Sequence, residues 1–589
     1  MNLTPEEREV GKQNFLEAVG TTRRDFLKGT VIAGAATGVS LGAMYYGYGS
    51  KLEDPLRIGI IGTGDEGGVL IGGLNPDYVQ VVAIADIRPY SQHRAFHGDW
   101  SSEGTKKARP GLMDVYGWKT EDEARKHVKV YTDSYEDLLA DNDVEAIIIA
   151  LPLWLHDVVA IKAMRVGKPV LTEKLMAHSV RQCKEMARVA EETGLILATG
   201  HQRHYSILYD NAVDQIRSGL IGDIHYIRAQ WNRDNLPGHD SWKPPLPEPI
   251  KGFHDFEVAL NAAKKKGSQA VAEVVAAHPL FSKLRSWRGK LKNARGAAID
   301  TWQQRVNQVE KQLDDVIVDA AKYGYQTKTL PDGRERTAMG ELIRWRLWNR
   351  TGGGLMVELG SHQLDAASIF IAAQNPSKEE VMPLSVEGVG CRSIFPADRD
   401  VDDHVQCTFE FPAAGYYKSE DSREIGDANK KTIVAYSSIN GNGFGGYGEV
   451  VLGTKGTLVL AREKEAMLFK GSNTSTKISV KQGQGGAQMD TYETGGGPAA
   501  AVAQAAMPTE VSRGYKEEIE HWAWCIRNPA PEHQPKCNPE VALADAVIAL
   551  SSNIAMRENR RIEFKPEWFD KNDDATPEGD KPRPLSELV

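Results

Sequence analysis

A glycine-rich turn between an apolar strand and a helix constrains this chain more than any other feature. Residues 56–61 form a short apolar run that leads directly into the pattern GxGxxG at residues 62–67. In this pattern the first glycine makes the tight turn, the second lets the backbone approach a pyrophosphate, and the third lets helix and strand pack closely. The phosphates would lie at the helix N-terminus, where backbone N–H groups favour anions. The turn therefore predicts a dinucleotide site that includes Gly62, Thr63, Gly64, Glu66 and Gly67.

A second apolar run, residues 79–85, ends on an acid about 20 residues beyond the turn, Asp86. A carboxylate at this strand end accepts hydrogen bonds from the ribose hydroxyls and repels a 2′-phosphate. We therefore expect NAD(H) as the cofactor. Arg88 lies two residues later and keeps NADP(H) possible, because a nearby arginine accommodates the phosphate.

Strands and helices continue to alternate up to about residue 205. The strands are strongly apolar, as in residues 146–150, which indicates a parallel sheet covered on both faces. We expect a doubly wound, Rossmann-type domain over residues 51–205. The predicted strands are residues 145–151, 169–172 and 195–199, and the helices between them are residues 156–166 and 179–193.

A second domain is expected over residues 206–573. Its later segments alternate between apolar and polar residues, which predicts an α+β domain with a large, mostly antiparallel open sheet. Two helices would close it, and residues 574–589 are expected to form a loose tail. The predicted strands are residues 224–231, 405–411, 432–438, 448–452 and 457–460, and the closing helices are residues 515–527 and 539–557.

A block of charged helices, residues 245–345, interrupts the second domain. Residues 251–345 contain 17 Lys and Arg against 11 Asp and Glu, although the whole chain carries a net charge of −9. Charged amphipathic helices usually form a solvated surface. A solvated helical insertion is the first expectation, and a lid over the site or an oligomer contact is the alternative.

The N-terminal 50 residues resemble an export signal. Residues 22–28, Thr-Arg-Arg-Asp-Phe-Leu-Lys, precede an uncharged Gly- and Ala-rich stretch from 29 to 48, which is typical of the twin-arginine route. The alternative is a basic turn before a buried helix. We expect the Tat translocase as a partner and a periplasmic location, with the protein either soluble or anchored by residues 1–50.

Composition excludes several classes of function. An acidic chain of 589 residues without a basic run interleaved with aromatics lacks the field that nucleic-acid partners require. The five cysteines show no CxxC spacing, and the histidines show no HExxH pattern. We therefore predict a soluble enzyme with no nucleic-acid partner and no metal.

The chemistry is expected where the two domains meet, at the carboxyl ends of the parallel strands. Glu173 and Lys174 follow directly on the strand at 169–172, which places the lysine toward the nicotinamide pocket. Downstream of three glycines at 352–354, the residues Glu358, His362 and Asp365 have i, i+4, i+7 spacing, which places them on one helical face.

These motifs together resemble the Gfo/Idh/MocA family of NAD(P)-dependent oxidoreductases over about 55–240 and 345–560. The resemblance rests on the GxGxxG turn and Ala85-Asp86, on Leu151-Pro152-Leu153-Trp154-Leu155-His156, on Gly167 to Lys174, on the GGG…Glu-x-Gly-x-His-x-x-Asp run and on Gly453 to Thr457. It implies hydride transfer between the cofactor and a secondary alcohol or ketone of a sugar, cyclitol or sugar derivative. It also implies cofactor contacts by Leu151, Pro152, His156, Glu173 and Lys174, and a homo-oligomer formed through the C-terminal sheet.

The same resemblance assigns catalytic roles. Lys174 would hydrogen-bond the reacting oxygen, His362 would be the general acid/base, and Glu358 would orient them or bind substrate. Imidazole has a suitable pKa for removing a hydroxyl proton, and an ammonium stabilises alkoxide character. Two positions depart from the family pattern: Leu175 replaces the proline of Glu-Lys-Pro, and Glu358 replaces an aspartate.

Substrate contacts are expected from the segment after the last Rossmann strand, where the family has polar residues. Its donors suit a polyhydroxylated ligand, and Arg203 could also bind a carboxylate or phosphate. Two alternatives to a dehydrogenase stay open. One is a glycosidase that uses NAD for transient oxidation and elimination, although the redox glycosidases we know lack the Glu-Lys pair at this strand end. The other is a non-catalytic ligand-binding relic. The predicted substrate residues are His201, Arg203, Tyr205 and Asp365.

Overall fold

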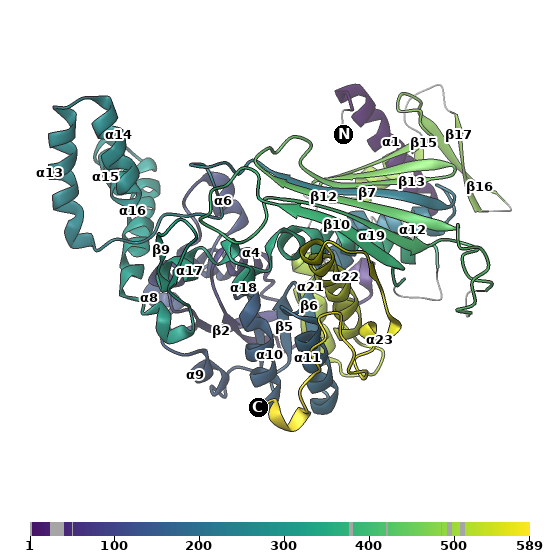
Figure 1. Ribbon diagram of the computed structural model, residues 1–589, viewed down its shortest axis with the longest axis horizontal. Coiled ribbons are helices and arrows are strands. Elements are labelled where there is room, and N and C mark those ends of the chain that lie inside the picture. The colour runs from purple at the N-terminus through teal and green to yellow at the C-terminus, as the bar shows by residue number, and fades with distance from the viewer. Residues whose placement is uncertain are drawn as a thin grey trace.

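The computed structural model describes residues 3–23, 41–49, 51–375, 381–419, 422–483, 486–491, 498–506 and 513–589. Two sheets organise the molecule (Figure 1). The six-stranded sheet lies in the N-terminal domain and has the strand order β3-β2-β1-β4-β5-β6. The eight-stranded sheet lies in the second domain and has the order β15-β14-β13-β7-β12-β11-β10-β18. The expected fold class, a Rossmann domain followed by an α+β domain, is confirmed.

All strands of the first sheet run parallel, so their carboxyl ends lie along one edge. Ile61 at the end of β1 pairs with Ala85 of β2 and with Ile149 of β4, and Glu173 of β5 pairs with Gly200 of β6. The residues that follow these strands, which include Asp86 and Lys174, therefore lie along that edge. The strands are β1 (Leu56–Ile61), β2 (Val79–Ala85), β3 (Lys129–Tyr131), β4 (Ala146–Ile149), β5 (Val170–Glu173) and β6 (Leu197–Gly200).

Helices cover both faces of this sheet, as its apolar strands predict. The first helix, α4, begins directly at the glycine turn, and α5 follows β2. The helices used below are α4 (Asp65–Gly73), α5 (Pro89–His97), α10 (His156–Arg165) and α11 (Val180–Thr193).

The second sheet is antiparallel at every junction except one. Strand β12 pairs in parallel with β7, because β7 comes from the start of the domain and inserts between two later strands. Two helices, α19 (Ser361–Ala372) and α22 (Pro539–Glu558), contact one another beneath the sheet. The strands are β7 (Ile224–Arg233), β10 (Ser385–Cys391), β11 (His404–Pro412), β12 (Lys431–Asn440), β13 (Tyr447–Gly453), β14 (Gly456–Ala461), β15 (Glu465–Lys470) and β18 (Ile562–Glu563).

The core helix α22 (Pro539–Glu558) is the one helix in the described ranges that is long and apolar enough to cross a membrane. However, 78% of its apolar window is buried inside the protein, as expected for a central helix of a folded domain. It lies between α11 and α19 (Ser361–Ala372) and contacts both. The other predicted closing helix is α21 (Tyr515–Arg527).

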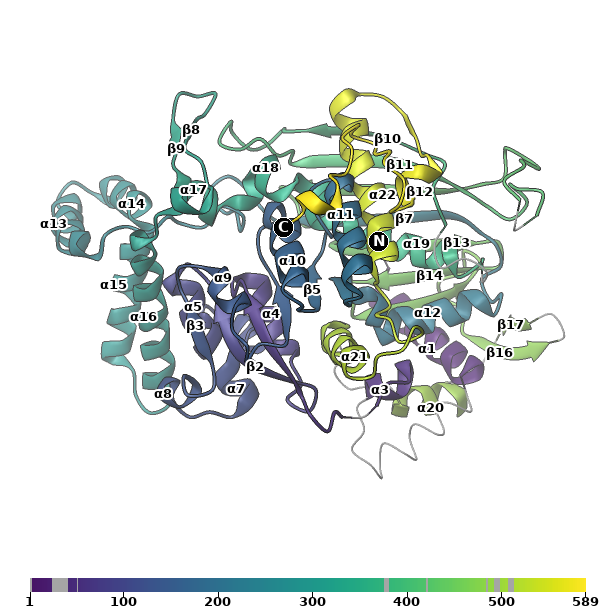
Figure 2. The same cartoon turned by 90° about the horizontal axis from the view of Figure 1, so that it is seen from below.

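The insertion forms a helical arm that projects from one side of the molecule (Figure 1). Its helices are α13 (Phe253–Lys264), α14 (Ser268–Ala277), α15 (Pro279–Asn293) and α16 (Ala298–Asp314). They have a small apolar core of their own, which includes Phe256, Leu284 and Val309. Helix α16 lies along α5 of the Rossmann domain (Figure 2). The arm is therefore not merely a solvated hairpin, since one of its helices is part of a domain contact.

Residues 1–50 were expected to be a signal or anchor. Within this range α1 (Pro5–Thr22) packs against β15 and α20 (Pro498–Ala506) at the edge of the second sheet. The Asn14 amide donates to the carbonyls of Leu468 and Thr476 and accepts from the N–H of Ile478, all within 3.1 Å. The segment before the paired arginines is thus an element of the fold. Arg24 and the uncharged stretch up to residue 40 lie outside the described residues.

The C-terminal tail differs from the expectation of a loose segment. The buried ammonium of Lys184 on α11 donates to the carbonyls of Glu567, Asp573 and Ala575 at 2.7–2.9 Å. Further along, Arg583 pairs with the buried Glu185 at 2.7 Å. The tail is ordered because it supplies the acceptors for the buried Lys184 and a second arginine for Glu185, which also pairs with Arg181 on α11.

Candidate functional site

The glycine turn has the shape that a dinucleotide requires. Gly62 adopts a φ of +89°, and a Cβ there would lie 2.4 Å from the carbonyl oxygen of Ala150. A Cβ on Gly67 would lie 2.3 Å from the carbonyl oxygen of Gly62, so only glycine allows the helix to approach the strand. Around Gly64, by contrast, a Cβ would meet nothing within 4 Å. This open space at the N-terminus of α4 fits a pyrophosphate.

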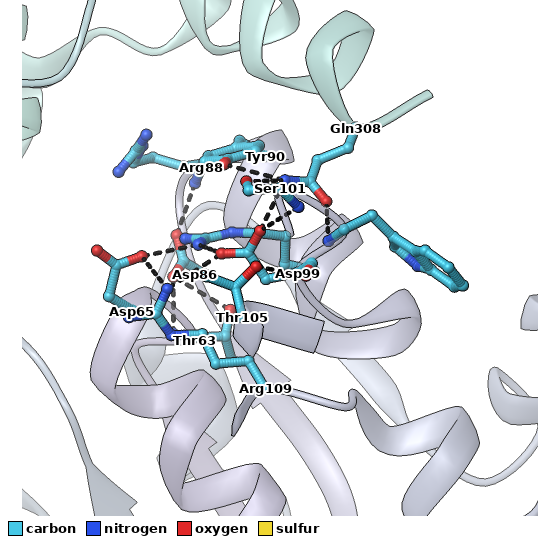
Figure 3. A network of polar contacts seen from close by, with 12 residues as sticks. Thr63, Asp65, Asp86, Arg88, Tyr90, Asp99, Ser101, Thr105, Arg109 and Gln308 are labelled. Carbon is cyan, nitrogen blue, oxygen red and sulfur yellow. Dashed lines mark hydrogen bonds and ion pairs between the residues drawn. The ribbon is translucent and has the colours of Figure 1, made fainter. Parts of the chain in front are cut away.

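Asp86 lies against the glycine turn. The N–H of Thr63 donates to Asp86 Oδ2 at 2.8 Å, and the N–H of Arg88 donates to Oδ1 at 2.9 Å (Figure 3). Oδ2 also accepts from the hydroxyl of Thr63 at 3.2 Å, so Oδ1 is the oxygen that retains acceptor capacity for a ribose hydroxyl. The structure thus brings Thr63 and Asp86 together, as the sequence predicts for the ribose end of the site.

The side chain of Arg88 pairs with Asp315 of the insertion. The guanidinium donates through Nε at 2.9 Å and Nη2 lies 2.8 Å from the same carboxylate oxygen. Asp315 belongs to the short helix Asp315–Ile317 that follows α16 of the insertion. The side chain expected to accommodate a 2′-phosphate is therefore already engaged.

Three further carboxyl groups near the turn, those of Asp65, Glu66 and Glu173, have different surroundings. Asp65 in the first turn of α4 pairs with Arg94 at 2.7 Å. Glu66 has one buried oxygen without a partner among the described residues. Burial and the neighbouring Glu66 raise the pKa of Glu173, and one of its oxygens also has no partner in the described ranges. A buried carboxyl with a raised pKa in a cleft is characteristic of a functional site.

Lys174 reaches the position that the sequence predicts, although Leu175 replaces proline. The Lys174–Leu175 peptide is cis, and Leu175 is fully buried. Lys174 Nζ donates to the carbonyl oxygen of Glu358 at 2.9 Å and lies 3.5 Å from Glu358 Oε2. The lysine therefore bridges the carboxyl end of β5 and the segment before α19.

Glu358 lies in a π-helical turn, Met356–Gly360, which leads into α19. Such turns are rare and are frequent at functional sites. Its second partner is Arg346, which donates to Oε1. Burial alone would raise the pKa of Glu358, but the charges of Arg346 and Lys174 hold it at about 2. The carboxyl is thus ionised and orients two cations.

His362 follows one turn later and faces the same region. Its side chain is 8% exposed, and its ring centroid lies 5.5 Å from that of Trp231. Burial, together with the charges of Lys174 and Arg203, lowers the pKa of His362 well below 6.5. The imidazole is therefore neutral at neutral pH, which is the state that a general base needs. The structure brings Lys174, Glu358 and His362 together, as predicted.

Asp365 belongs to a separate polar cluster beside these residues. It accepts a hydrogen bond from His204 at 2.7 Å, and His201 Nδ1 lies 3.8 Å from its other oxygen. His201 is fully buried, and burial lowers its pKa to about 4. Donor atoms of His201, Cys537 and Asp545 lie within 4.8 Å of one another, so metal analysis is a direct test of the predicted absence of metal.

Arg203 and Tyr205 have internal partners instead of facing a ligand. Arg203 is 1% exposed, and its guanidinium donates to Glu449 at 2.9 Å and to Glu463 at 2.8 Å. Tyr205 is equally buried, and its hydroxyl oxygen accepts from the N–H of Lys536 at 2.8 Å. The expectation that they contact substrate is corrected, because the groups that would bind a ligand are used to join β6, α19 and the second sheet.

His156 also has a supporting position. Its two ring nitrogens lie 2.9 Å from the carbonyl oxygens of Leu151 and Leu175. Burial lowers its pKa, so one nitrogen donates at a time. His156 thus ties the loop after β4, which includes Pro152, to the loop that carries Lys174. It thereby positions the backbone of two loops that border the predicted cofactor site.

Three residues of the site were not predicted from sequence. Arg346 orients Glu358, Asp315 binds Arg88, and Glu518 on α21 is buried with neither oxygen partnered among the described residues. Burial raises the pKa of Glu518 well above 4.5. Arg346 and Asp315 lie in or beside the charged insertion, whose composition does not distinguish a site residue from a surface charge. The proximity of Arg346 to the glycine run was the one available signal.

The parallel sheet, the glycine turn and Asp86 together define a dinucleotide-binding domain of the Rossmann type. Residues 56–201 match the model of the GFO_IDH_MocA family, described as an oxidoreductase family with an NAD-binding Rossmann fold. The N-terminal domain is therefore similar to the NAD-binding domain of this family.

Several known proteins are similar to this chain. A 1,5-anhydro-D-fructose reductase of Ensifer adhaerens is 33% identical over 24% of this chain and 44% of its own length. A glycosyl hydrolase family 109 protein of Solibacter usitatus is 27% identical over 38% of this chain and 50% of its own. The chain spans about half the length of the relatives it matches. Among solved structures, an aldose-aldose oxidoreductase from Caulobacter crescentus aligns over 87% of this chain and all of its own, with 15% identity and a TM-score of 0.46.

Proposed function

We propose that this protein is an NAD-dependent oxidoreductase that transfers hydride between the cofactor and a secondary alcohol or ketone of a sugar, cyclitol or sugar derivative. One observation carries the proposal: at the carboxyl end of β5 the ammonium of Lys174 contacts Glu358, one helical turn before the buried His362, whose pKa is lowered by burial and by the charge of Lys174. The names of similar proteins, which include a reductase of an anhydrosugar, support the substrate class.

The residues divide the chemistry between them. Gly62, Gly64 and Gly67 would hold the pyrophosphate, and Asp86 would hold the ribose. The bound cofactor supplies a hydride acceptor, or a donor in the reverse direction. When an alcohol is oxidised, His362 accepts the hydroxyl proton, and Lys174 stabilises negative charge on the same oxygen. Glu358 keeps Lys174 in place, because its carboxyl and carbonyl oxygens both contact Nζ.

The cofactor provides the first test. We expect NAD(H) to copurify with the folded protein, to be released by denaturation, and to be identified by mass spectrometry. Asp86→Ser should relax discrimination against NADP(H), because the carboxylate that binds the ribose and repels the phosphate is lost. Equal affinity of the unmodified protein for both cofactors would remove the assignment of Asp86.

The pH dependence of the reaction provides a second test. Because the pKa of His362 lies well below 6.5, kcat/KM should stay constant as the pH falls from neutral to 6.5 and decrease only at lower pH. Lys174→Met removes a positive charge that disfavours the imidazolium, so the pKa of His362 should rise and the decrease in kcat/KM at low pH should begin at a higher pH. If that decrease stays at the same pH or moves to a lower pH, the assignment of His362 as the general base is contradicted.

A redox glycosidase is the second candidate, because the chain is similar to a glycosyl hydrolase family 109 protein. In that mechanism, oxidation at one sugar carbon acidifies the neighbouring C–H, the glycosidic group is eliminated, and the hydride returns. Such an enzyme exchanges that proton in deuterated water and needs no added oxidant. A dehydrogenase shows stoichiometric cofactor reduction, or paired sugar oxidation and reduction, and leaves glycosidic bonds intact. A screen of sugars and aryl glycosides separates the two; a non-catalytic relic would turn over neither class.

Export by the twin-arginine route is a further part of the proposal, with a periplasmic location and the Tat translocase as a partner. Replacement of Arg23 and Arg24 by lysine should leave folded protein in the cytoplasm, because a receptor recognises the arginines and not merely their charge. Arg23 also pairs with Asp210 at 2.7 Å and with Asp214, so a stability measurement of the variant is needed as a control for folding. Cell fractionation measures the outcome, and an undiminished periplasmic yield argues against this route.

The homo-oligomer through the C-terminal sheet stays a prediction.

A further inference from the structure

We infer that Asp315, in the helical insertion, determines cofactor specificity by holding Arg88 away from the ribose and so making the site prefer NAD(H) over NADP(H). The inference rests on the proposed function, since it requires a nicotinamide dinucleotide at the glycine turn.

Arg88 contacts two carboxylates, Asp86 through its backbone and Asp315 through its side chain. Its backbone N–H donates to Asp86 Oδ1 at 2.9 Å, so Arg88 lies beside the carboxylate predicted to bind the ribose (Figure 3). Its side chain turns to Asp315 Oδ2, which accepts from Nε at 2.9 Å and lies 2.8 Å from Nη2. These two nitrogens form the edge with which arginine grips a phosphate or a carboxylate. Asp315 therefore occupies the part of Arg88 that a 2′-phosphate needs.

The position of Asp315 is well fixed. Its side chain is 1% exposed, and its other oxygen accepts a hydrogen bond from the N–H of Tyr90 at 2.9 Å. On the preceding helix, Gln308 accepts from the N–H of Trp100 at 2.7 Å and donates to Asp99 at 3.0 Å. The carboxylate is thus anchored to α5, and the helix that precedes it is anchored to the loop after α5.

The charges lead to the same conclusion. A free arginine two residues after the ribose carboxylate would attract a 2′-phosphate. Pairing with Asp315 neutralises that arginine and leaves Asp86 as the charge beside the ribose. The insertion thus supplies a specificity residue that lies more than 200 positions beyond Arg88 in the sequence.

The test uses the full-length protein freed of nucleotide, with isothermal titration of NAD⁺ and NADP⁺. Asp315→Ala should raise the affinity for NADP⁺ about 10- to 100-fold, which is what one or two charge-assisted hydrogen bonds contribute, and should change the affinity for NAD⁺ little. The double variant Asp315→Ala with Arg88→Leu should lose this gain. Asp314→Ala, in the adjacent residue and 38% exposed, is the matched control and should leave both affinities unchanged.

A second variant keeps the inference testable if Asp315→Ala does not fold. Arg88→Leu alone should not weaken NADP⁺ binding, because the arginine is already engaged in the unmodified protein. The inference is overturned if Asp315→Ala leaves the ratio of affinities unchanged, if the double variant keeps the gain, or if Arg88→Leu weakens NADP⁺ binding. Failure of the unmodified protein to bind either nucleotide would instead reject the proposed function itself.

Discussion

Replacement of either Lys174 or His362 by alanine is expected to lower turnover by about 10²- to 10⁴-fold, the usual contribution of a positioned acid/base group. Cofactor affinity should change little, because neither side chain contacts the glycine turn or Asp86 in the structure. The measurement is steady-state kinetics with the substrate found in the screen, together with titration of NAD⁺. A loss in kcat and kcat/KM of equal size would show that the interaction is made in the transition state.

Matched variants separate this role from a structural one. His225→Ala and Lys119→Ala change exposed residues of the same types and should keep full activity. Glu358→Asp should be mild, because it retains the charge that orients Lys174 and restores the residue common in the family. Full activity of the His362→Ala protein would remove the acid/base assignment, whichever reaction is found.

Arg203→Met is expected to destabilise the protein by about 3–5 kcal/mol, because the buried Glu449 loses its arginine partner while Glu463 keeps only Arg513. Glu449 and Glu463 both accept hydrogen bonds from this guanidinium and are 1% exposed. Burial already raises the pKa of Glu449 to about 7 even with Arg203 in place. The measurement is chemical denaturation of the variant and of the unmodified protein, in which a signal from the second domain reports unfolding.

The pH dependence of the unfolding free energy identifies the cause of the destabilisation by Arg203→Met. Without Arg203 the carboxyl pKa values rise further, and a group with a raised folded pKa stabilises the folded state at low pH and loses that contribution as the pH increases. The destabilisation by Arg203→Met should therefore shrink as the pH is lowered below 7. Arg125→Met, in an exposed pair with Glu121, is the control and should change stability little. A variant with unchanged stability but a raised KM would restore Arg203 as a substrate ligand.

The sequence predicts the parts of this protein that depend on local patterns. The glycine turn, the alternating strands and helices, and the spacing from Glu358 to Asp365 each leave a signal within a few residues. The structure accordingly has β1, β2 and α22 within one or two residues of their expected bounds. Lys174 also lies where predicted, because the register of β5 fixes the residue that follows it.

The errors concern contacts between distant segments. Polar residues after β6 are as consistent with a substrate site as with the buried pairs of Arg203, because composition does not reveal the acids that the second sheet supplies. The partner of Arg88 is similarly hidden, since Asp315 belongs to a block of ordinary charged helices. The tail after Asp573 is polar and lacks periodicity, and only the buried Lys184 on α11 explains its order.

The attachment of this tail has a consequence for the order of events during synthesis. Helix α11 belongs to the first domain, yet Ala575, which accepts from Lys184, and Arg583, one of the two arginines that pair with Glu185, lie 391 and 398 residues later in the chain. The first domain therefore cannot complete its packing until residues 567–583 have been synthesised. Packing of the early domain therefore depends on a segment that is synthesised much later, so assembly of the cofactor-binding half is coupled to synthesis of residues 567–583.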